Sequence, residues 1–193
     1  VAKLNLNVGS LVAPIWGGPA MGSKEDRAVF VDMVKRSCRF GQKLKEFGVN
    51  LLIHQPRLSM LDRWLQRDKL DVEMEKVGVG LIPFSILAQG LLTTKYLKEI
   101  PKDSRIGNPD VPFLNENSVT EELRAKLVQL NEMASKRGQT LAEMAVSWTC
   151  VQRGVSTVLL GVSRLSQLES NLKAISNLEF TKEELDFIDK ITK

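Results

Sequence analysis

The sequence feature that most constrains the fold is a set of short apolar runs separated by segments with helical periodicity. Runs of strand length lie at 49–54, 79–84 and 157–162, and a helix is predicted at about 60–76 between the first two. Continuous apolar runs, without strict alternation, are typical of strands covered on both faces. Because strands that alternate with helices form parallel sheets with right-handed crossovers, the pattern predicts an α/β fold.

Further helices are marked by a hydroxyl residue followed three positions later by a glutamate, the capping-box pattern. These pairs are Ser118 with Glu121, Thr140 with Glu143, and Thr181 with Glu184. The last two predicted helices, at about 166–175 and 182–191, follow the final apolar run.

The N-terminal part has a different pattern. Residues 2–8 alternate between apolar and polar side chains, and a turn separates them from a second short run at 11–15. This predicts a β-hairpin. A helix is predicted over 24–40, with Ser23 and Asp26 as its cap.

Composition excludes several classes of protein. The chain has 193 residues, of which 43% are hydrophobic and 26% charged, so it can bury an ordinary globular core. No apolar run is long enough to span a membrane, and two cysteines far apart in sequence indicate a reducing, cytoplasmic compartment. The net charge of +4 comes from lysines and arginines interleaved with acids, which argues against nucleic-acid binding.

Residues 98–117 form a long segment with three prolines and no periodicity. Loops of this length are usually functional, so we interpret the segment as a lid over a ligand. A disordered surface insertion is the alternative.

Two clusters carry the functional prediction. Residues 83–96 read PFSILAQGLLTTKY, and residues 160–171 read LGVSRLSQLESN. In the second cluster Gly161 and Ser163 stand where a strand turns into a helix, so that free N–H groups and the helix dipole favour an anion there. Arg164 can bind such an anion with two hydrogen bonds.

These clusters, together with LIHQP at 52–56, resemble the aldo-keto reductases, in the branch of the glyceraldehyde-phosphate-type reductases and the potassium-channel beta subunits. The resemblance implies a TIM-type (β/α)8 barrel closed by an N-terminal hairpin, with ligands at the carboxyl ends of the strands. It also implies NADP(H) as cofactor and reduction of aldehydes or ketones by hydride transfer.

By the same resemblance, Gln55 binds the nicotinamide carboxamide. The residues implied for the pyrophosphate are Ser85, Leu87, Gln89, Lys95 and Arg105. Those implied for the adenosine end and its 2′-phosphate are Gly161, Ser163, Arg164, Gln167 and Asn171. Taken singly, Gln89 is equally compatible with an ordinary helix cap, and Lys95 and Arg105 with solvated surface positions.

The sequence departs from the family pattern at several positions. Leu58 stands in place of the aromatic ring that stacks on the nicotinamide, and Ser59 in place of its neighbouring asparagine. Ile86 replaces a proline, and Ser170 replaces a glutamate, although Glu169 is adjacent.

The family's catalytic residues, an aspartate, a tyrosine, a lysine and a histidine, cannot be assembled from this chain. The one tyrosine, Tyr96, falls in a structural position of the loop motif, and the one histidine, His54, lies on a strand at the cofactor side. A lone histidine on such a strand is more often a packed core residue than a catalytic base.

A seam near Gly41–Gln42 explains the missing residues. Residues before it resemble the family's opening hairpin, first strand and first helix, whereas residues after it resemble the end of a much later helix. We therefore predict a single domain over 1–193 with an internal deletion near 41–42, and an incomplete barrel of about four strands plus the hairpin. Four strands cannot close a barrel that needs eight, so a homo-oligomer of two half-barrels, poor stability, or a longer natural molecule are the alternatives.

Two functions follow. The first is an NADP(H)-binding aldo-keto-reductase-type protein that reduces a small carbonyl substrate if the missing core is present. The second is a catalytically silent NADP(H)-binding regulatory or scaffold protein.

Overall fold

The computed structural model describes residues 23–25, 28–29, 31–32, 35–36, 39, 43, 53–100, 106 and 118–192. The described positions from Lys24 to Lys43 are helical, in agreement with the helix predicted over 24–40. The predicted hairpin, the predicted seam and nearly all of the predicted lid lie outside the described residues.

The described sheet is parallel, as predicted. Strand β1 (Ile53–His54) pairs with β2 (Gly80–Leu81), and Ile53 lies opposite Gly80. The pairing continues beyond the named strands, because the Phe84 amide donates a hydrogen bond to the Pro56 carbonyl at 3.0 Å.

The third predicted strand, at 157–162, is wrong as a strand. The chain runs parallel to β2 from Val155, where the Ser156 amide donates to the Leu81 carbonyl at 2.9 Å and the Leu159 amide to the Pro83 carbonyl at 2.8 Å. Among the described residues the only bridge that this segment forms is the isolated one between Val155 and Leu81, so its pairing does not continue as a regular ladder. We call residues 155–159 the edge segment.

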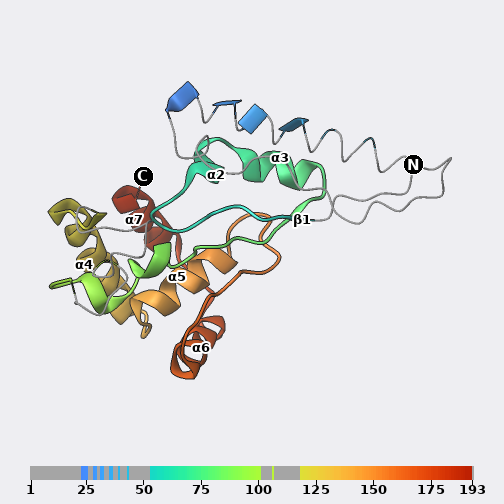
Figure 1. Cartoon of the computed structure of the whole chain (residues 1–193). Helices are drawn as coiled ribbons and strands as arrows, with labels where there is room; N and C mark the ends of the chain where they lie inside the picture. The colour runs from blue at the N-terminus through green and yellow to red at the C-terminus, as the bar shows by residue number, and fades with distance from the viewer. Residues whose placement is uncertain are drawn as a thin grey trace.

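The helix predicted over 60–76 is two shorter helices, α2 (Trp64–Arg67) and α3 (Leu70–Lys76), which lie beside each other in Figure 1. Between them Lys69 has φ of 56°, a left-handed conformation that an α-helix cannot include. The sequence has no glycine or proline at this break, so composition gave no sign of it.

The remaining named elements of the described residues are helical. They are η3 (Ala88–Gly90), η4 (Thr94–Tyr96), α4 (Glu121–Lys136), α5 (Leu141–Cys150), α6 (Leu165–Leu172), η6 (Lys173–Ser176) and α7 (Lys182–Thr192). In Figure 1, α6 projects away from the group formed by α4, α5 and α7.

Two of the three predicted hydroxyl–glutamate caps are confirmed, and the cap predicted at Ser23 with Asp26 involves a residue outside the described ones. Thr140 with Glu143 forms a reciprocal capping box at α5, and Thr181 with Glu184 makes the same pair of hydrogen bonds at α7. The cap predicted at Ser118 is wrong. The hydroxyl of Thr120 accepts the hydrogen bond, from the Leu123 amide at 3.1 Å, because Thr120 directly precedes the first helical residue.

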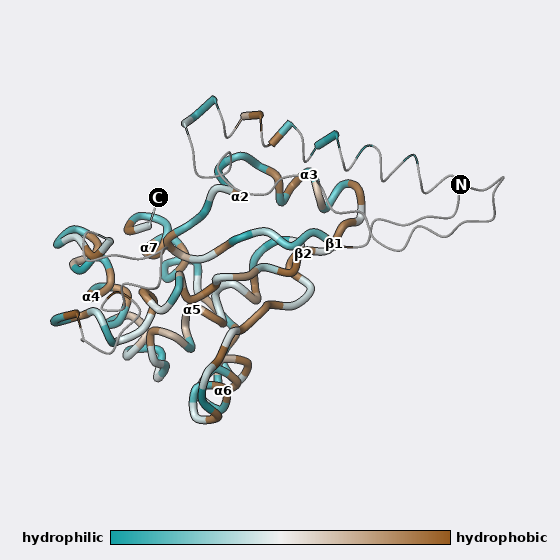
Figure 2. The backbone as a smooth tube through the Cα atoms, in the orientation of Figure 1, coloured by the Kyte–Doolittle hydropathy of each residue, from teal (hydrophilic) through white to brown (hydrophobic). Residues whose placement is uncertain are grey.

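The core lies between the sheet and the helices. Its largest fully buried side chains include Trp148 of α5, Tyr96 of η4 and Leu81 of β2. Figure 2 shows apolar residues continuing along the segment that leads from α5 to α6, outside the helical core.

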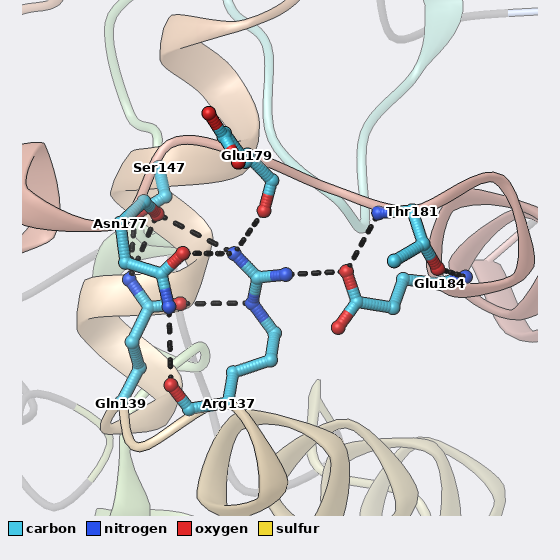
Figure 3. A network of polar contacts seen from close by, with 7 residues as sticks. All are labelled: Arg137, Gln139, Ser147, Asn177, Glu179, Thr181 and Glu184. Atoms are coloured by element: carbon cyan, nitrogen blue, oxygen red, sulfur yellow. Dashed lines mark hydrogen bonds and ion pairs between the residues drawn. The ribbon is translucent and has the colours of Figure 1, made fainter.

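Helix α7 is held at both ends by arginines. Near its carboxyl end Arg63, which is 10% exposed at its side chain, pairs with Asp189 and lies 5.0 Å from the centre of the Trp148 ring. Near its amino end Arg137, the residue after α4, is 4% exposed at its side chain (Figure 3). Its guanidinium donates hydrogen bonds to the side chains of Gln139, Asn177 and Glu184 and to the carbonyl of Glu179.

Candidate functional site

A cavity of about 890 Å³ opens where β2 and the edge segment end. It is lined by the loop that follows β2, by residues 159–164 after the edge segment, by α6 and by Ala142 of α5. Its volume is that of a small-molecule or cofactor site. The carboxyl ends of parallel strands are where α/β folds place ligands, so the position agrees with the one predicted.

The structure brings most of the predicted cofactor residues to this cavity. Those that line it are Ser85, Leu87, Gln89, Lys95, Gly161, Ser163, Arg164, Gln167 and Asn171. Gln55 is exposed and is not among the lining residues, so the structure does not join it to the others. Arg105 lies outside the described residues.

Other residues line the cavity that the sequence had not assigned to the cofactor. They include Thr93, Thr94 and Tyr96 of the loop, Ala142 of α5, and Ser166 and Ser170 of α6. For Ser166 and Ser170 a signal existed, because they are four residues apart on α6, as Gln167 and Asn171 are, and therefore share a face of that helix. For Ala142 there was none, since its position depends on how α5 packs against α6.

The loop after β2 has an unusual backbone. Ser85, Ala88 and Gln89 have φ of 58°, 47° and 59°, and Gly90 has φ of 100°. Left-handed conformations at residues other than glycine cost free energy and are concentrated at ligand sites. Two short turns hold the loop in this conformation: the Ala88 amide donates to the Ser85 carbonyl, and the Gly90 amide to the Leu87 carbonyl, both at 2.8 Å.

The opposite wall contains the amino end of α6, which differs from those of α4, α5 and α7. Each of those helices has a threonine cap and at least one glutamate in its first turn. Helix α6 begins after Arg164 with no side-chain cap and no acid in its first turn. Its positive end therefore faces the cavity without an internal anion, and it suits an anionic ligand.

Ser163 and Gln167 are bonded to each other in front of this helix end. The Gln167 side-chain oxygen accepts from the Ser163 amide at 3.0 Å and from the Ser163 hydroxyl at 3.2 Å. The Ser163 amide, predicted from the sequence to be free for an anion, thus already has a partner. The bond fixes the turn that presents Arg164, which is exposed.

The candidate acid and base residues do not form a pair at the cavity. Tyr96 lines the cavity but is 2% exposed. His54 lies on β1 and is not among the lining residues. Burial lowers the pKa of His54 from 6.5 to about 4, and its buried Nε2 atom has no hydrogen-bond partner. His54 is thus a neutral, packed side chain, as the sequence favoured.

The described residues contain no group of three or more His, Cys, Asp and Glu side chains that could hold a metal ion. Within the described part of the chain, no helix has the length and apolar character needed to cross a membrane.

Comparison with known proteins decides the family. The family model named "Aldo/keto reductase family" matches residues 33–193. This chain belongs to the aldo/keto reductase family. The predicted membership is confirmed.

Relatives in this family extend beyond the matched chain. The L-glyceraldehyde 3-phosphate reductases of Escherichia coli O157:H7 and of Escherichia coli strain K12 are each 45% identical over 159 residues. The alignment covers 81% of this chain and 46% of each relative. The chain therefore spans about half the length of the curated relatives that it matches.

Solved aldo-keto reductases share the fold. A holo-form enzyme from Bacillus halodurans has a TM-score of 0.56 at 20% identity, covering 83% of this chain and 56% of that one. A thermostable aldo-keto reductase in complex with the inhibitor epalrestat has a TM-score of 0.52 at 22% identity, covering 72% of this chain and 39% of that one. These neighbours indicate a barrel-type aldo/keto reductase fold for the described part of the chain.

Proposed function

We propose that this chain carries the cofactor-binding part of an NADPH-dependent aldo-keto reductase that reduces small aldehydes or ketones by hydride transfer. The observation that carries the proposal is the uncapped, acid-free amino end of α6, which opens with Arg164 onto a cavity of cofactor size. A phosphate group satisfies free helix N–H groups and a guanidinium together.

The residues present fit such a cofactor. Arg164, Gln167 and Asn171 lie along one side of α6, where they would hold the adenosine end and its 2′-phosphate. Lys95 and the left-handed loop at 85–90 stand on the other wall, where they would hold the pyrophosphate. The bound cofactor supplies the hydride, and these residues bind and orient it.

The substrate class follows from the relatives. Because the two Escherichia coli relatives are named L-glyceraldehyde 3-phosphate reductases, a short phosphorylated aldehyde is the first substrate to assay. The general acid for such a reaction is not among the described cavity residues, so we propose that it comes from outside them.

The absence of a general acid among the described cavity residues favours a second function, one without catalysis. The sequence holds one histidine and one tyrosine, and both are largely buried. A catalytically silent NADP(H)-binding regulatory or scaffold protein needs neither. Consumption of NADPH with an aldehyde supports the reductase, whereas NADPH binding without consumption supports the silent protein.

Replacement of Arg164 tests the cofactor site. For Arg164→Ala we expect NADPH affinity to fall by about 10- to 100-fold, because a charge-assisted contact to the 2′-phosphate is lost. NADH affinity should change little, since NADH lacks that phosphate. Nucleotide fluorescence titrations measure both, and Arg67→Ala, an exposed arginine on α2 outside the cavity lining, is the matched control. Equal losses for NADPH and NADH would contradict the proposal.

A further inference from the structure

Helix α5 supports α6 and the following η6 through two polar side chains that are one helical turn apart. Glu143 accepts a hydrogen bond from the Ser170 hydroxyl at 3.0 Å. The Ser147 hydroxyl is bonded to the Ala174 carbonyl at 2.9 Å. Both residues of α5 are buried, with 8% exposure for Glu143 and 0% for Ser147. Glu143 thus connects the buried face of α5 to the helix that carries the proposed adenosine site, and Ser147 connects it to η6, which follows that helix directly.

The direction of the Ser170–Glu143 hydrogen bond is fixed by chemistry. One carboxylate oxygen of Glu143 accepts from the Thr140 amide at 2.9 Å, within the capping box, and the other faces Ser170. A carboxylate has no hydrogen to donate, so the hydroxyl of Ser170 must be the donor. Its hydrogen is therefore committed to Glu143, and only its lone pairs remain for another partner.

Ser170 also lines the cavity. A hydroxyl in this state presents an acceptor to a ligand, and the carboxylate behind it strengthens that acceptor by polarising the O–H bond. Ser170 lies six residues after Arg164, which is about 9 Å along a helix at 1.5 Å per residue. That span is the length of one nucleoside, so a ligand with its phosphate at Arg164 can place the far edge of its base near Ser170.

We propose that Ser170 accepts a hydrogen bond from the purine amino group of the bound cofactor, and that Glu143 is a positioning residue that makes Ser170 an acceptor. The proposal rests on the NADP(H) site proposed above. It adds a specificity for the base that depends on a buried carboxylate from the neighbouring helix.

The test compares NADPH with its hypoxanthine analogue, in which a carbonyl oxygen replaces the purine amino group. We expect the natural chain to prefer NADPH by about tenfold, the effect of one hydrogen bond with a polarised partner. In Ser170→Ala the two affinities should become equal within about twofold, because neither form gains a partner.

Glu143→Gln gives a sharper outcome. The glutamine oxygen can keep the hydrogen bond from the Thr140 amide, which leaves its NH₂ group facing Ser170. The hydroxyl must then accept from Gln and donate into the cavity, so the preference should reverse in favour of the analogue. A merely structural role for Glu143 would weaken both nucleotides together and leave their ratio unchanged. Ser135→Ala, an exposed serine of α4 away from the cavity, should keep the natural ratio.

The outcomes separate the two proposals. Absence of binding of either nucleotide to the natural chain would overturn the proposed function and this inference with it. Binding of NADPH with a ratio that stays at its natural value in both Ser170→Ala and Glu143→Gln would overturn this inference alone. If Glu143→Gln does not fold, as judged by its circular dichroism, Ser170→Ala decides, because it leaves the capping box of α5 intact.

Discussion

Replacement of Arg137 by alanine should be among the most destabilising single changes in the described part of the chain. The guanidinium holds together the carboxyl end of α4, the segment 177–180 and the amino end of α7 (Figure 3). The central carbon of this guanidinium also lies 3.8 Å from the centre of the Phe180 ring. Alanine would leave the Glu184 carboxylate, the Asn177 side chain and the Glu179 carbonyl without this donor.

The magnitude follows from burial. Breaking a fully buried ion pair by removing one partner costs about 3–5 kcal/mol. Glu184 is 25% exposed at its side chain and keeps the hydrogen bond from the Thr181 amide, so water and the cap recover part of that cost. Loss of the cation–π contact adds about 0.5–1 kcal/mol. We therefore expect a loss of about 2–4 kcal/mol in the free energy of unfolding for Arg137→Ala, against a total of about 5–15 kcal/mol for a typical domain.

Urea denaturation followed by tryptophan fluorescence measures this loss, because Trp64 and Trp148 are both buried. Arg137→Lys should cost about half as much, since an ammonium keeps the charge but cannot reach the separate acceptors of a planar guanidinium. Arg36→Ala is the control: Arg36 pairs with Asp32 at 67% side-chain exposure and should change stability by less than about 0.5 kcal/mol. A loss below about 1 kcal/mol for Arg137→Ala, with an unchanged slope of the unfolding free energy against urea concentration, would refute this account.

Two further predictions concern stability without cofactor. Burial lowers the pKa of His54 from 6.5 to about 4, so as the pH decreases the unfolded chain binds a proton at His54 before the folded chain does. The free energy of unfolding should therefore fall between pH 6.5 and about pH 4, by roughly 3 kcal/mol at the lower pH. Urea midpoints at several pH values check this, and a His54→Gln variant with the same pH dependence as the natural chain would contradict it. Gly90→Ala should cost about 1–2 kcal/mol from backbone strain alone, since φ is 100° and an added Cβ meets no atom within 4 Å. Thermal melts measure the loss, with Gly161→Ala as the control. At Gly161 the space is equally open and φ is not in the left-handed region, so its replacement should be close to neutral. Equal losses of stability at the two glycines would exclude backbone strain as the cause.

The sequence predicted those features that depend on neighbouring residues. The alternation of apolar runs and helices gave the parallel sheet, and the hydroxyl–glutamate spacing gave the caps at Thr140 and Thr181. The second cluster predicted the turn into α6 and the residues that this helix turns toward the cavity. In each case the signal and its structural consequence lie within a few residues of each other.

The features that were missed depend on tertiary contacts. Lys69, Ser85, Ala88 and Gln89 adopt left-handed conformations without being glycine or asparagine, so local composition favours other conformations there. The Glu143–Ser170 hydrogen bond joins residues from two helices, and no local pattern indicates it. The edge segment makes only an isolated bridge to β2, because a run of apolar residues does not by itself specify the backbone pairing that a continuous ladder needs.

These contacts also explain how a chain that spans about half of its relatives can present an organised cavity. Glu143 and Ser147 of α5 support α6 and η6, and the Gln139 side chain donates to Ser147 at 2.8 Å while accepting from Arg137. A continuous set of hydrogen bonds therefore runs from the anchor of α7 to the cavity wall, and every member lies in residues 137–184. Four apolar side chains of the sheet region, by contrast, are at least 39% exposed: Ile53, Phe84, Leu159 and Val162. Because the hydrogen bonds that support α6 do not pass through those exposed positions, the placement of α6 should depend on the carboxyl-terminal helices more than on the sheet region. Arg137→Ala should then weaken NADPH binding as well as lower stability, although Arg137 does not line the cavity.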